Sequence, residues 1–170
     1  PFFIILFGSI FSVMWVKLSK IGKNPSIPLK FCFGIVQLAL GFLLTQVGFQ
    51  FVNEAYQVPL ITLVFLYMLH TTGELFLSPI GLSMVTKLSP KSMAGTAMGA
   101  WFLSFAIANY VGGKIASLTG GHGGGEATSA ESGLLQYLDT FATIGYVLLT
   151  IAAIIFILNK PIQKLMHGVE

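Results

Sequence analysis

Long apolar runs, separated by short polar segments, dominate the pattern along the chain. A helix that crosses a bilayer takes about 20 predominantly apolar residues, and five runs approach or exceed this length. They cover residues 1–16, 31–52, 58–86, 93–118 and 135–158. The pattern therefore predicts an all-α integral membrane protein with five transmembrane helices.

Segments rich in proline, glycine and small polar residues separate these runs. The shorter ones read GKNPSIP at 22–28, NEAYQ at 53–57 and SPKS at 89–92, and residues of this kind end helices and form turns. The longest is a Gly-rich segment at 119–133. It has neither the lysine nor the preceding strand that a phosphate-binding loop requires, so we interpret it as an extracytoplasmic linker.

The placement of the few charges predicts how the spans are oriented. Only 9% of the residues are charged, and the net charge of +3 is too small and too scattered to favour a nucleic-acid partner. The first and third segments between the runs and the C-terminal tail hold most of the lysines: Lys17, Lys20, Lys23, Lys30, Lys87, Lys91, Lys160 and Lys164. Because lysines collect on the cytoplasmic side, we expect a multi-pass protein of the cell (inner) membrane with a cytoplasmic C-terminus.

The third run carries a carboxylate, Glu74, near its middle. A carboxylate within a membrane span is costly and usually marks the path of a substrate or an ion. Steps of three and four residues place it on one helix face with Tyr67, His70, Thr71, Ser78 and Leu82. Pro79 lies in the same run and, because it lacks the N–H that closes a helical turn, predicts a kink.

Two interpretations of Glu74 remain open at this point. It faces a cavity and binds a proton, a cation or an ammonium group, or it is a protonated acid that hydrogen-bonds across helices. His70 lies one turn away, but two side chains are too few to predict a metal site, so we expect none. In the fourth run, Met98 and Trp101 share a face. This tryptophan belongs either to an interfacial aromatic belt or to the lining of a cavity.

Two strings in the third and fourth runs resemble a known transporter family. GELFLSPIGLSMVTKLSP at 73–90 and AGTAMGAWFLSFAIANYVGG at 94–113 are similar to sequences of the proton-dependent oligopeptide transporter (POT/PTR) family of the major facilitator superfamily. The spacing from Glu74 to Ser78 and the position of Trp101 fit that family. The resemblance implies that residues 1–170 form part of the C-terminal six-helix bundle, with helices eight to twelve of a twelve-helix fold.

The resemblance also implies a function and a set of site residues. The protein would be a symporter rather than an enzyme, carrying di- and tripeptides into the cell with protons and without a cofactor. Glu74 would face the amino group of the peptide, and Ser78 and Trp101 would line the same pocket. With the residues of the stripe, the candidate substrate-binding residues are Glu74, Ser78, Trp101, Tyr67 and His70. Leu82, Met98 and Trp101 would form an apolar gate.

Part of the family's machinery is absent from this sequence. No ExxER string, which the family uses in proton coupling, occurs in it. One wall of a central cavity cannot transport alone, so we expect the N-terminal helical half of the same protein as a partner, together with the bilayer. Two alternatives remain: a membrane subunit or assembly factor without transport, and a same-family carrier of another small solute.

Overall fold

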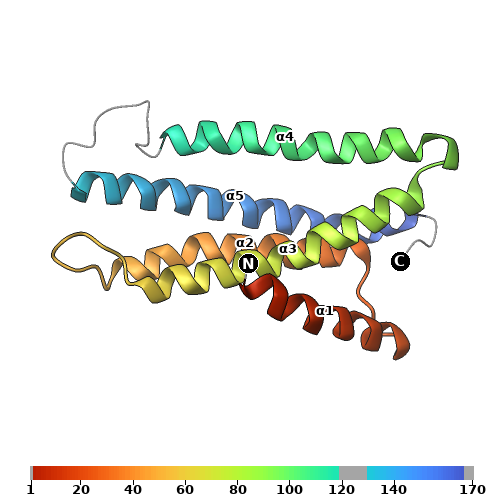
Figure 1. Cartoon of the computed structure of the whole chain (residues 1–170), viewed down its shortest axis with the longest axis horizontal. Helices are drawn as coiled ribbons and strands as arrows, with labels where there is room; N and C mark the ends of the chain where they lie inside the picture. The colour runs from red at the N-terminus through yellow and green to blue at the C-terminus, as the bar shows by residue number, and fades with distance from the viewer. Residues whose placement is uncertain (1, 119–129, 167–170) are drawn as a thin grey trace.

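The protein, described here by a computed structural model, is a set of long helices that run roughly along one direction (Figure 1). The structure describes residues 2–118 and 130–166. Within these residues there is no strand, and the elements are α1 (Phe2–Lys20), α2 (Ile27–Phe49), α3 (Leu60–Leu88), the short 3-10 helix η1 (Lys91–Met93), α4 (Ala94–Leu118) and α5 (Ala130–Leu165). The prediction of an all-α membrane fold is confirmed.

Four of the described helices, α1, α2, α3 and α5, are long and apolar enough to cross a membrane. The fourth expected span, α4, is long enough at 25 residues. Its hydropathy is too low for it to be counted with the other four helices, because glycine, serine, threonine and asparagine are spread along it. Small residues of this kind suit close contact between membrane helices better than contact with lipid.

The helices extend beyond several of the apolar runs. α1 continues to Lys20 instead of ending at residue 16, and α5 spans Ala130–Leu165 instead of 135–158. Polar and charged residues at the membrane edge still make helical backbone hydrogen bonds, so an apolar run outlines the membrane core rather than the helix ends. Of the Gly-rich segment at 119–133, residues 119–129 lie outside the described part, and residues 130–133 are helical.

Helix α2 is the centre of the bundle because it packs against both α3 and α5. On one side its backbone approaches α3 closely: a Cβ atom built on Gly34 would lie 2.9 Å from the carbonyl oxygen of Gly73. On the other side, the amide of Gln46 donates to the carbonyl oxygen of Leu138 at 2.7 Å. The fully buried Ala39 lies between these contacts in the sequence of α2. Small residues thus bring the helices into direct contact.

Helix α1 is joined to α3 through aromatic rings. The ring of Phe76, on α3, meets Phe11 and Trp15 of α1 edge-on, with centroids 5.0 and 5.2 Å apart. Edge-to-face packing of this kind is favourable because the positive ring edge meets a negative ring face. The ammonium group of Lys30, on α2, lies 4.8 Å from the centroid of Trp15. The ring of Trp15 is therefore held between α2 and α3.

Helix α3 places the candidate site, and α4 follows it in a hairpin through η1. The axis of α3 bends in its C-terminal half (Figure 1), the half that contains Pro79. This agrees with the kink expected from a proline inside a helix. α4 touches α3 near η1 and leaves most of its other residues exposed. At the far end of the bundle, the Tyr56 hydroxyl donates to the carboxylate of Glu131 at 3.1 Å and connects the α2–α3 loop to α5.

Candidate functional site

Glu74 lies in a groove between α3 and the first turn of α1. The groove has a volume of about 580 Å³. Its polar groups come from Glu74, Thr71 and Tyr67, which are spaced by three and four residues on α3. Apolar side chains form the rest of its walls: Phe2, Phe3, Ile4, Leu60, Leu63 and Val64. The groove combines one carboxylate and two hydroxyls with an apolar lining, as small-molecule sites generally do.

The carboxylate of Glu74 is exposed on α3. Within residues 2–118 and 130–166, no side chain forms an ion pair with it and no group donates a hydrogen bond to it. One interpretation from the sequence was a protonated acid that hydrogen-bonds across helices. The described helices provide no partner for such a bond. A carboxylate at this depth without a protein partner can bind a proton or a cationic group that enters the groove.

Ser78 and the three gate candidates lie further along α3 and at its contact with α4. Ser78 is half-buried one turn beyond Glu74, and Leu82 is exposed, about 12 Å from Glu74 along the helix axis at 1.5 Å per residue. Trp101 lies against Gly81, where a Cβ atom would be 2.6 Å from Cζ2 of the indole. Met98 is half-buried one turn before Trp101 on α4. The structure thus places the gate candidates near the α3–α4 contact, apart from the groove that holds Glu74.

His70 is turned away from the groove. Its ring lies against the Phe42 ring of α2, with centroids 4.6 Å apart, and against Gly41. Helical geometry explains this placement: at about 100° per residue, His70 lies at the edge of the stripe defined by Tyr67 and Glu74, and α2 packs on that edge. The structure therefore brings Tyr67 and Glu74 together in one groove and places His70 in the α2–α3 interface.

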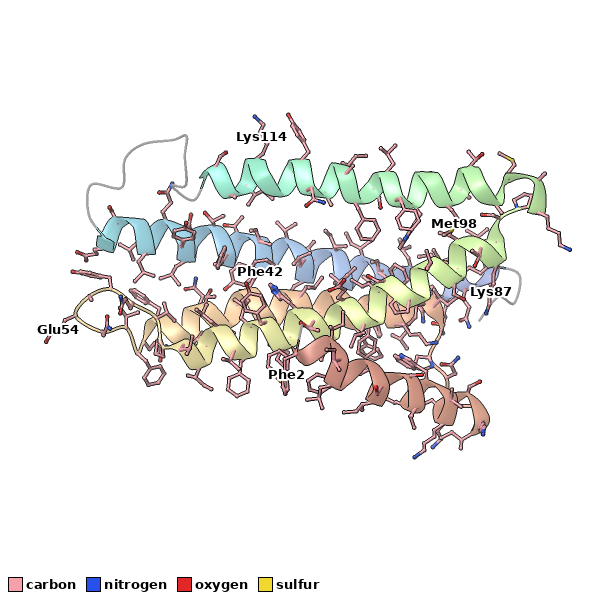
Figure 2. All side chains as sticks on the ribbon, viewed as in Figure 1. Phe2, Phe42, Glu54, Lys87, Met98 and Lys114 are labelled. Atoms are coloured by element: carbon pink, nitrogen blue, oxygen red, sulfur yellow. The ribbon has the colours of Figure 1, made fainter. Side chains whose placement is uncertain are left out.

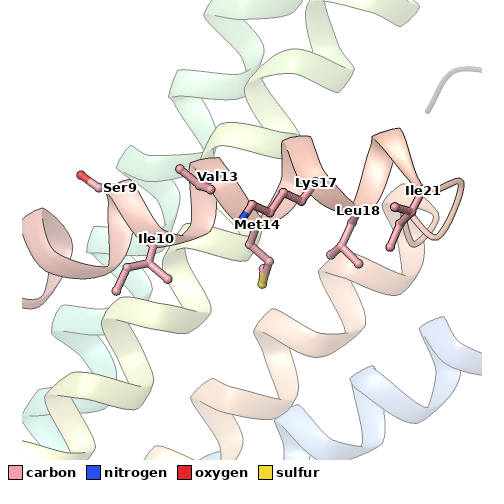
Figure 3. Close-up of a pocket in the computed structure, with 7 residues that line it drawn as sticks. All are labelled: Ser9, Ile10, Val13, Met14, Lys17, Leu18 and Ile21. Carbon is pink, nitrogen blue, oxygen red and sulfur yellow. The ribbon is translucent and has the colours of Figure 1, made fainter.

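Another hollow, of about 670 Å³, follows α1 (Figure 3). Its lining consists of Ser9, Ile10, Val13, Met14, Lys17, Leu18 and Ile21. Lys17 is the one charged residue among them, and the remaining side chains are mostly apolar. This is the composition of a helix face that meets lipid or another helix.

The described residues do not contain a group of three or more His, Cys, Asp or Glu side chains that could hold a metal ion.

Comparison with known proteins shows which family the chain belongs to. The sequence model described as the POT family matches residues 1–127. The chain belongs to the POT family. This is a family of membrane transporters and not of enzymes.

Individual relatives match almost the whole chain. Dipeptide and tripeptide permease A of Edwardsiella piscicida is 33% identical over 99% of the chain, and that of Serratia proteamaculans is 35% identical over 95%. Among solved structures, a peptide transporter POT in complex with sulfate superposes with a TM-score of 0.80 at 33% identity and covers 99% of the chain. The chain spans only about a third of each of these proteins, between 31% and 34% of their length.

Sequence reasoning missed the contribution of α1 to the groove. Phe2, Phe3 and Ile4 form the wall that faces Tyr67 and Glu74. A signal was present, because α1 carries phenylalanines at positions 3, 7 and 11 and a tryptophan at 15, each separated by four residues. In the structure, consecutive rings of this series have centroids 6.2 to 6.4 Å apart. The ridge they form is the face that α1 turns toward α3.

Proposed function

We propose that this chain is the C-terminal portion of a proton-coupled symporter for di- and tripeptides. The observation that carries the proposal is the carboxylate of Glu74, which is exposed in a groove at the middle of α3 and has no partner among the described residues. Membership of the POT family supports a transporter, and the names of the matching permeases support peptides as the substrate class.

Glu74 would bind the free amino group of the peptide. An ammonium group and a proton each bind to a carboxylate that has no other partner, so the two compete for the same oxygen atoms. Tyr67 lines the same groove and would contact the peptide through its hydroxyl or ring. Ser78, one turn deeper, would extend the site toward Trp101. Protons would serve as the coupling ion, and no cofactor would be involved.

Transport would require the N-terminal helical half of the same protein. The chain covers about a third of its relatives and supplies one wall of a central cavity. In secondary transporters, two halves rock against each other around a site near the middle of the bilayer. Leu82, Met98 and Trp101 would then meet the opposite half as an apolar gate. Alternating access would open the Glu74 groove to each side of the membrane in turn.

The proposed orientation places the protein in the cell (inner) membrane with its C-terminus in the cytoplasm. Figure 2 shows Glu54 and Lys87 at opposite ends of the molecule. The end that holds Glu54, in the α2–α3 loop, would be extracytoplasmic, and the end that holds Lys87 would be cytoplasmic. Lysines at the cytoplasmic end agree with the positive-inside rule.

The experiment that tests the function is dipeptide uptake by the full-length protein in liposomes, driven by a proton gradient. We expect Glu74→Gln to reduce uptake at least about tenfold, because losing one charge-assisted hydrogen bond costs about 1.5–3 kcal/mol. Glu54→Gln, a matched change in the exposed α2–α3 loop, should retain the wild-type rate. Unchanged uptake and an unchanged pH dependence in Glu74→Gln would remove Glu74 from the mechanism.

A same-family carrier of another small solute is the second candidate. The groove contains an acid and no basic side chain, so it favours a cationic group over an anion such as nitrate. If the same liposomes took up labelled nitrate and no dipeptide, the assignment of peptides as the substrate would be wrong. A membrane subunit or assembly factor without transport would show uptake of neither solute in the full-length protein.

A further inference from the structure

Two adjacent threonines on α3, Thr71 and Thr72, differ in the hydrogen bonds of their hydroxyl groups. Thr72 is buried, and its hydroxyl donates to the backbone carbonyl oxygens of Met68 and Leu69 at 2.9 and 3.1 Å. Thr71 is half-buried and lines the groove of Glu74, and its hydroxyl forms no hydrogen bond with any described residue. Its oxygen is also not one of the buried polar atoms that lack a partner, so it is open to the groove.

Helical geometry brings the Thr71 hydroxyl and the Glu74 carboxylate together. Residues three apart in a helix lie on one face, with their Cβ atoms about 5–6 Å apart. Helical side chains lean toward the N-terminus of their helix, so the carboxylate leans over the turn that holds Thr71 and away from Ser78. The lining of the groove agrees, because it includes Thr71 and Glu74 but not Ser78. A group bound in the groove can therefore reach the carboxylate and the Thr71 hydroxyl at once.

An ammonium group needs more acceptors than one carboxylate offers from a single side. It has three N–H donors and no acceptor, and the apolar walls of the groove cannot accept any of them. A donor that is buried without an acceptor weakens binding. A hydroxyl oxygen has two lone pairs, so Thr71 offers an acceptor whichever way its own proton points. The groove contains no basic side chain, so no ammonium group of its lining competes for this position.

The other hydroxyl of the groove, that of Tyr67, is less suitable as the additional acceptor. Tyr67 lies seven residues before Glu74, which is about 10 Å along the helix axis at 1.5 Å per residue. Its side chain leans toward the N-terminus of α3 and away from the carboxylate. Thr71 lies between the two, one turn from each, and is therefore the hydroxyl beside the carboxylate.

We propose that Thr71 is a further substrate-binding residue, whose hydroxyl oxygen accepts a hydrogen bond from the same ammonium group that Glu74 binds. The inference rests on the proposed function and deepens it, because it states which amino groups the site selects. A primary ammonium has three N–H groups, whereas a dimethylated ammonium has the same charge and only one. Attraction to the charge of Glu74 does not distinguish the two ions. A second acceptor beside the carboxylate does, so Thr71 contributes specificity for a free amino group.

The test is the dissociation constant of a dipeptide for the purified full-length protein, measured by calorimetry. Thr71→Val replaces the hydroxyl by a methyl group and should raise the dissociation constant about tenfold, as expected for the loss of a hydrogen bond to a charged group. Thr71→Ser restores a hydroxyl and should bind nearly as well as the wild type. Thr72→Val makes the same change at a hydroxyl that bonds to the backbone and should bind as the wild type does.

Two results of this comparison would overturn the proposal. One is wild-type affinity in Thr71→Val, and the other is a serine variant that binds as weakly as the valine variant. Thermal unfolding of each variant checks that it is folded. If Thr71→Val does not fold, Thr71→Ala removes the same hydroxyl and takes its place.

A second ligand assigns the hydroxyl to the amino group. The probe is the same dipeptide with an N,N-dimethylated amino group, measured by competition at about pH 6, below the usual pKa of an α-amino group. The wild type should prefer the unmodified dipeptide, and Thr71→Val should narrow the difference because only the unmodified dipeptide loses a hydrogen bond. Equal weakening of both ligands, or a difference that Thr71→Val does not narrow, would overturn the assignment to the amino group.

Failure of this inference is distinguishable from failure of the proposed function. If the wild type binds no dipeptide, or if Glu74→Gln takes up dipeptide as the wild type does, the proposed function is wrong. If the wild type binds dipeptide, Glu74→Gln loses uptake and Thr71→Val binds normally, only the role of Thr71 is wrong.

Discussion

At the scale of single residues, glycines set how closely α2 approaches α3. A Cβ atom on Gly34 would lie 2.8 Å from Cγ of Leu77 and 2.9 Å from the carbonyl oxygen of Gly73. The backbone oxygen cannot rotate away as a flexible side chain can. We predict that Gly34→Ala lowers the free energy of unfolding by about 1–3 kcal/mol, the usual cost of overpacking, as measured by thermal or denaturant unfolding in detergent.

The control for this change is Gly8→Ala on α1, where no described atom lies within 4 Å of the added Cβ. Alanine is a better helix former than glycine by about 1 kcal/mol, so this variant should be as stable as the wild type or slightly more stable. An equal loss of stability in both variants would show that the close contact at Gly34 is unimportant and that the helices adjust.

At the scale of helices, the ring of Phe76 connects α1 to the rest of the bundle. It is buried, with 9% of its surface exposed, and it contacts rings from two other helices: Phe11, Trp15 and Phe33. We predict that Phe76→Ala costs about 3 kcal/mol of unfolding free energy, since truncating a buried phenylalanine leaves a cavity that its neighbours only partly fill. The same unfolding measurement checks it.

A truncation on α4 serves for comparison. Phe102 is 58% exposed, and its one ring contact among the described residues is with Phe105 on the same helix. Phe102→Ala should change the unfolding free energy of this chain's bundle by much less than Phe76→Ala. If the two variants lost the same stability, the aromatic contact between α1 and α3 would not hold the helices together.

The sequence predicted which segments are helices more reliably than which faces of them meet. Apolar runs and Pro- and Gly-rich breaks located the helices, because both signals depend on local backbone chemistry. Helices that are apolar on all sides carry little hydrophobic contrast to identify a packing face, so the face of α1 that meets Phe76 is marked only by its series of aromatic residues at positions 3, 7, 11 and 15. Within the candidate site, the stripe on α3 predicted that Tyr67 and Glu74 share a helix face, and both line one groove, whereas the position of His70 depended on where α2 packs.

At the scale of the whole molecule, the described helices leave many large apolar side chains exposed. α4 touches the bundle mainly through its first turns and exposes most of its length (Figure 1). Figure 2 shows that Lys114 of α4 points away from the other helices. An exposed helix with glycines along its length is suited to contact with further helices, in agreement with a chain that spans about a third of its relatives.

The architecture predicts which positions water and substrate reach in the full-length protein. Single cysteines at positions 67, 70 and 74 would be tested with a water-soluble maleimide after Cys32, the one cysteine of this chain, and any cysteine elsewhere in the full-length protein are replaced by alanine. The reaction needs a thiolate, which forms only where water enters. We therefore expect labelling at 67 and 74, which line the groove, and slow labelling at 70, which lies against Gly41 and Phe42.

A dipeptide added before the maleimide should protect positions 67 and 74, because the bound peptide excludes the reagent from the groove. Leu40→Cys provides the control: Leu40 on α2 is 47% exposed in the structure but outside the groove, and in a bilayer its apolar surroundings would be lipid. It should stay unlabelled with or without peptide, since lipid suppresses thiolate formation. Labelling at position 74 without protection by the dipeptide would show that water enters the groove but that peptide does not bind there. Labelling at position 40 would show that exposure in the isolated chain, and not the groove, determines where the maleimide reacts.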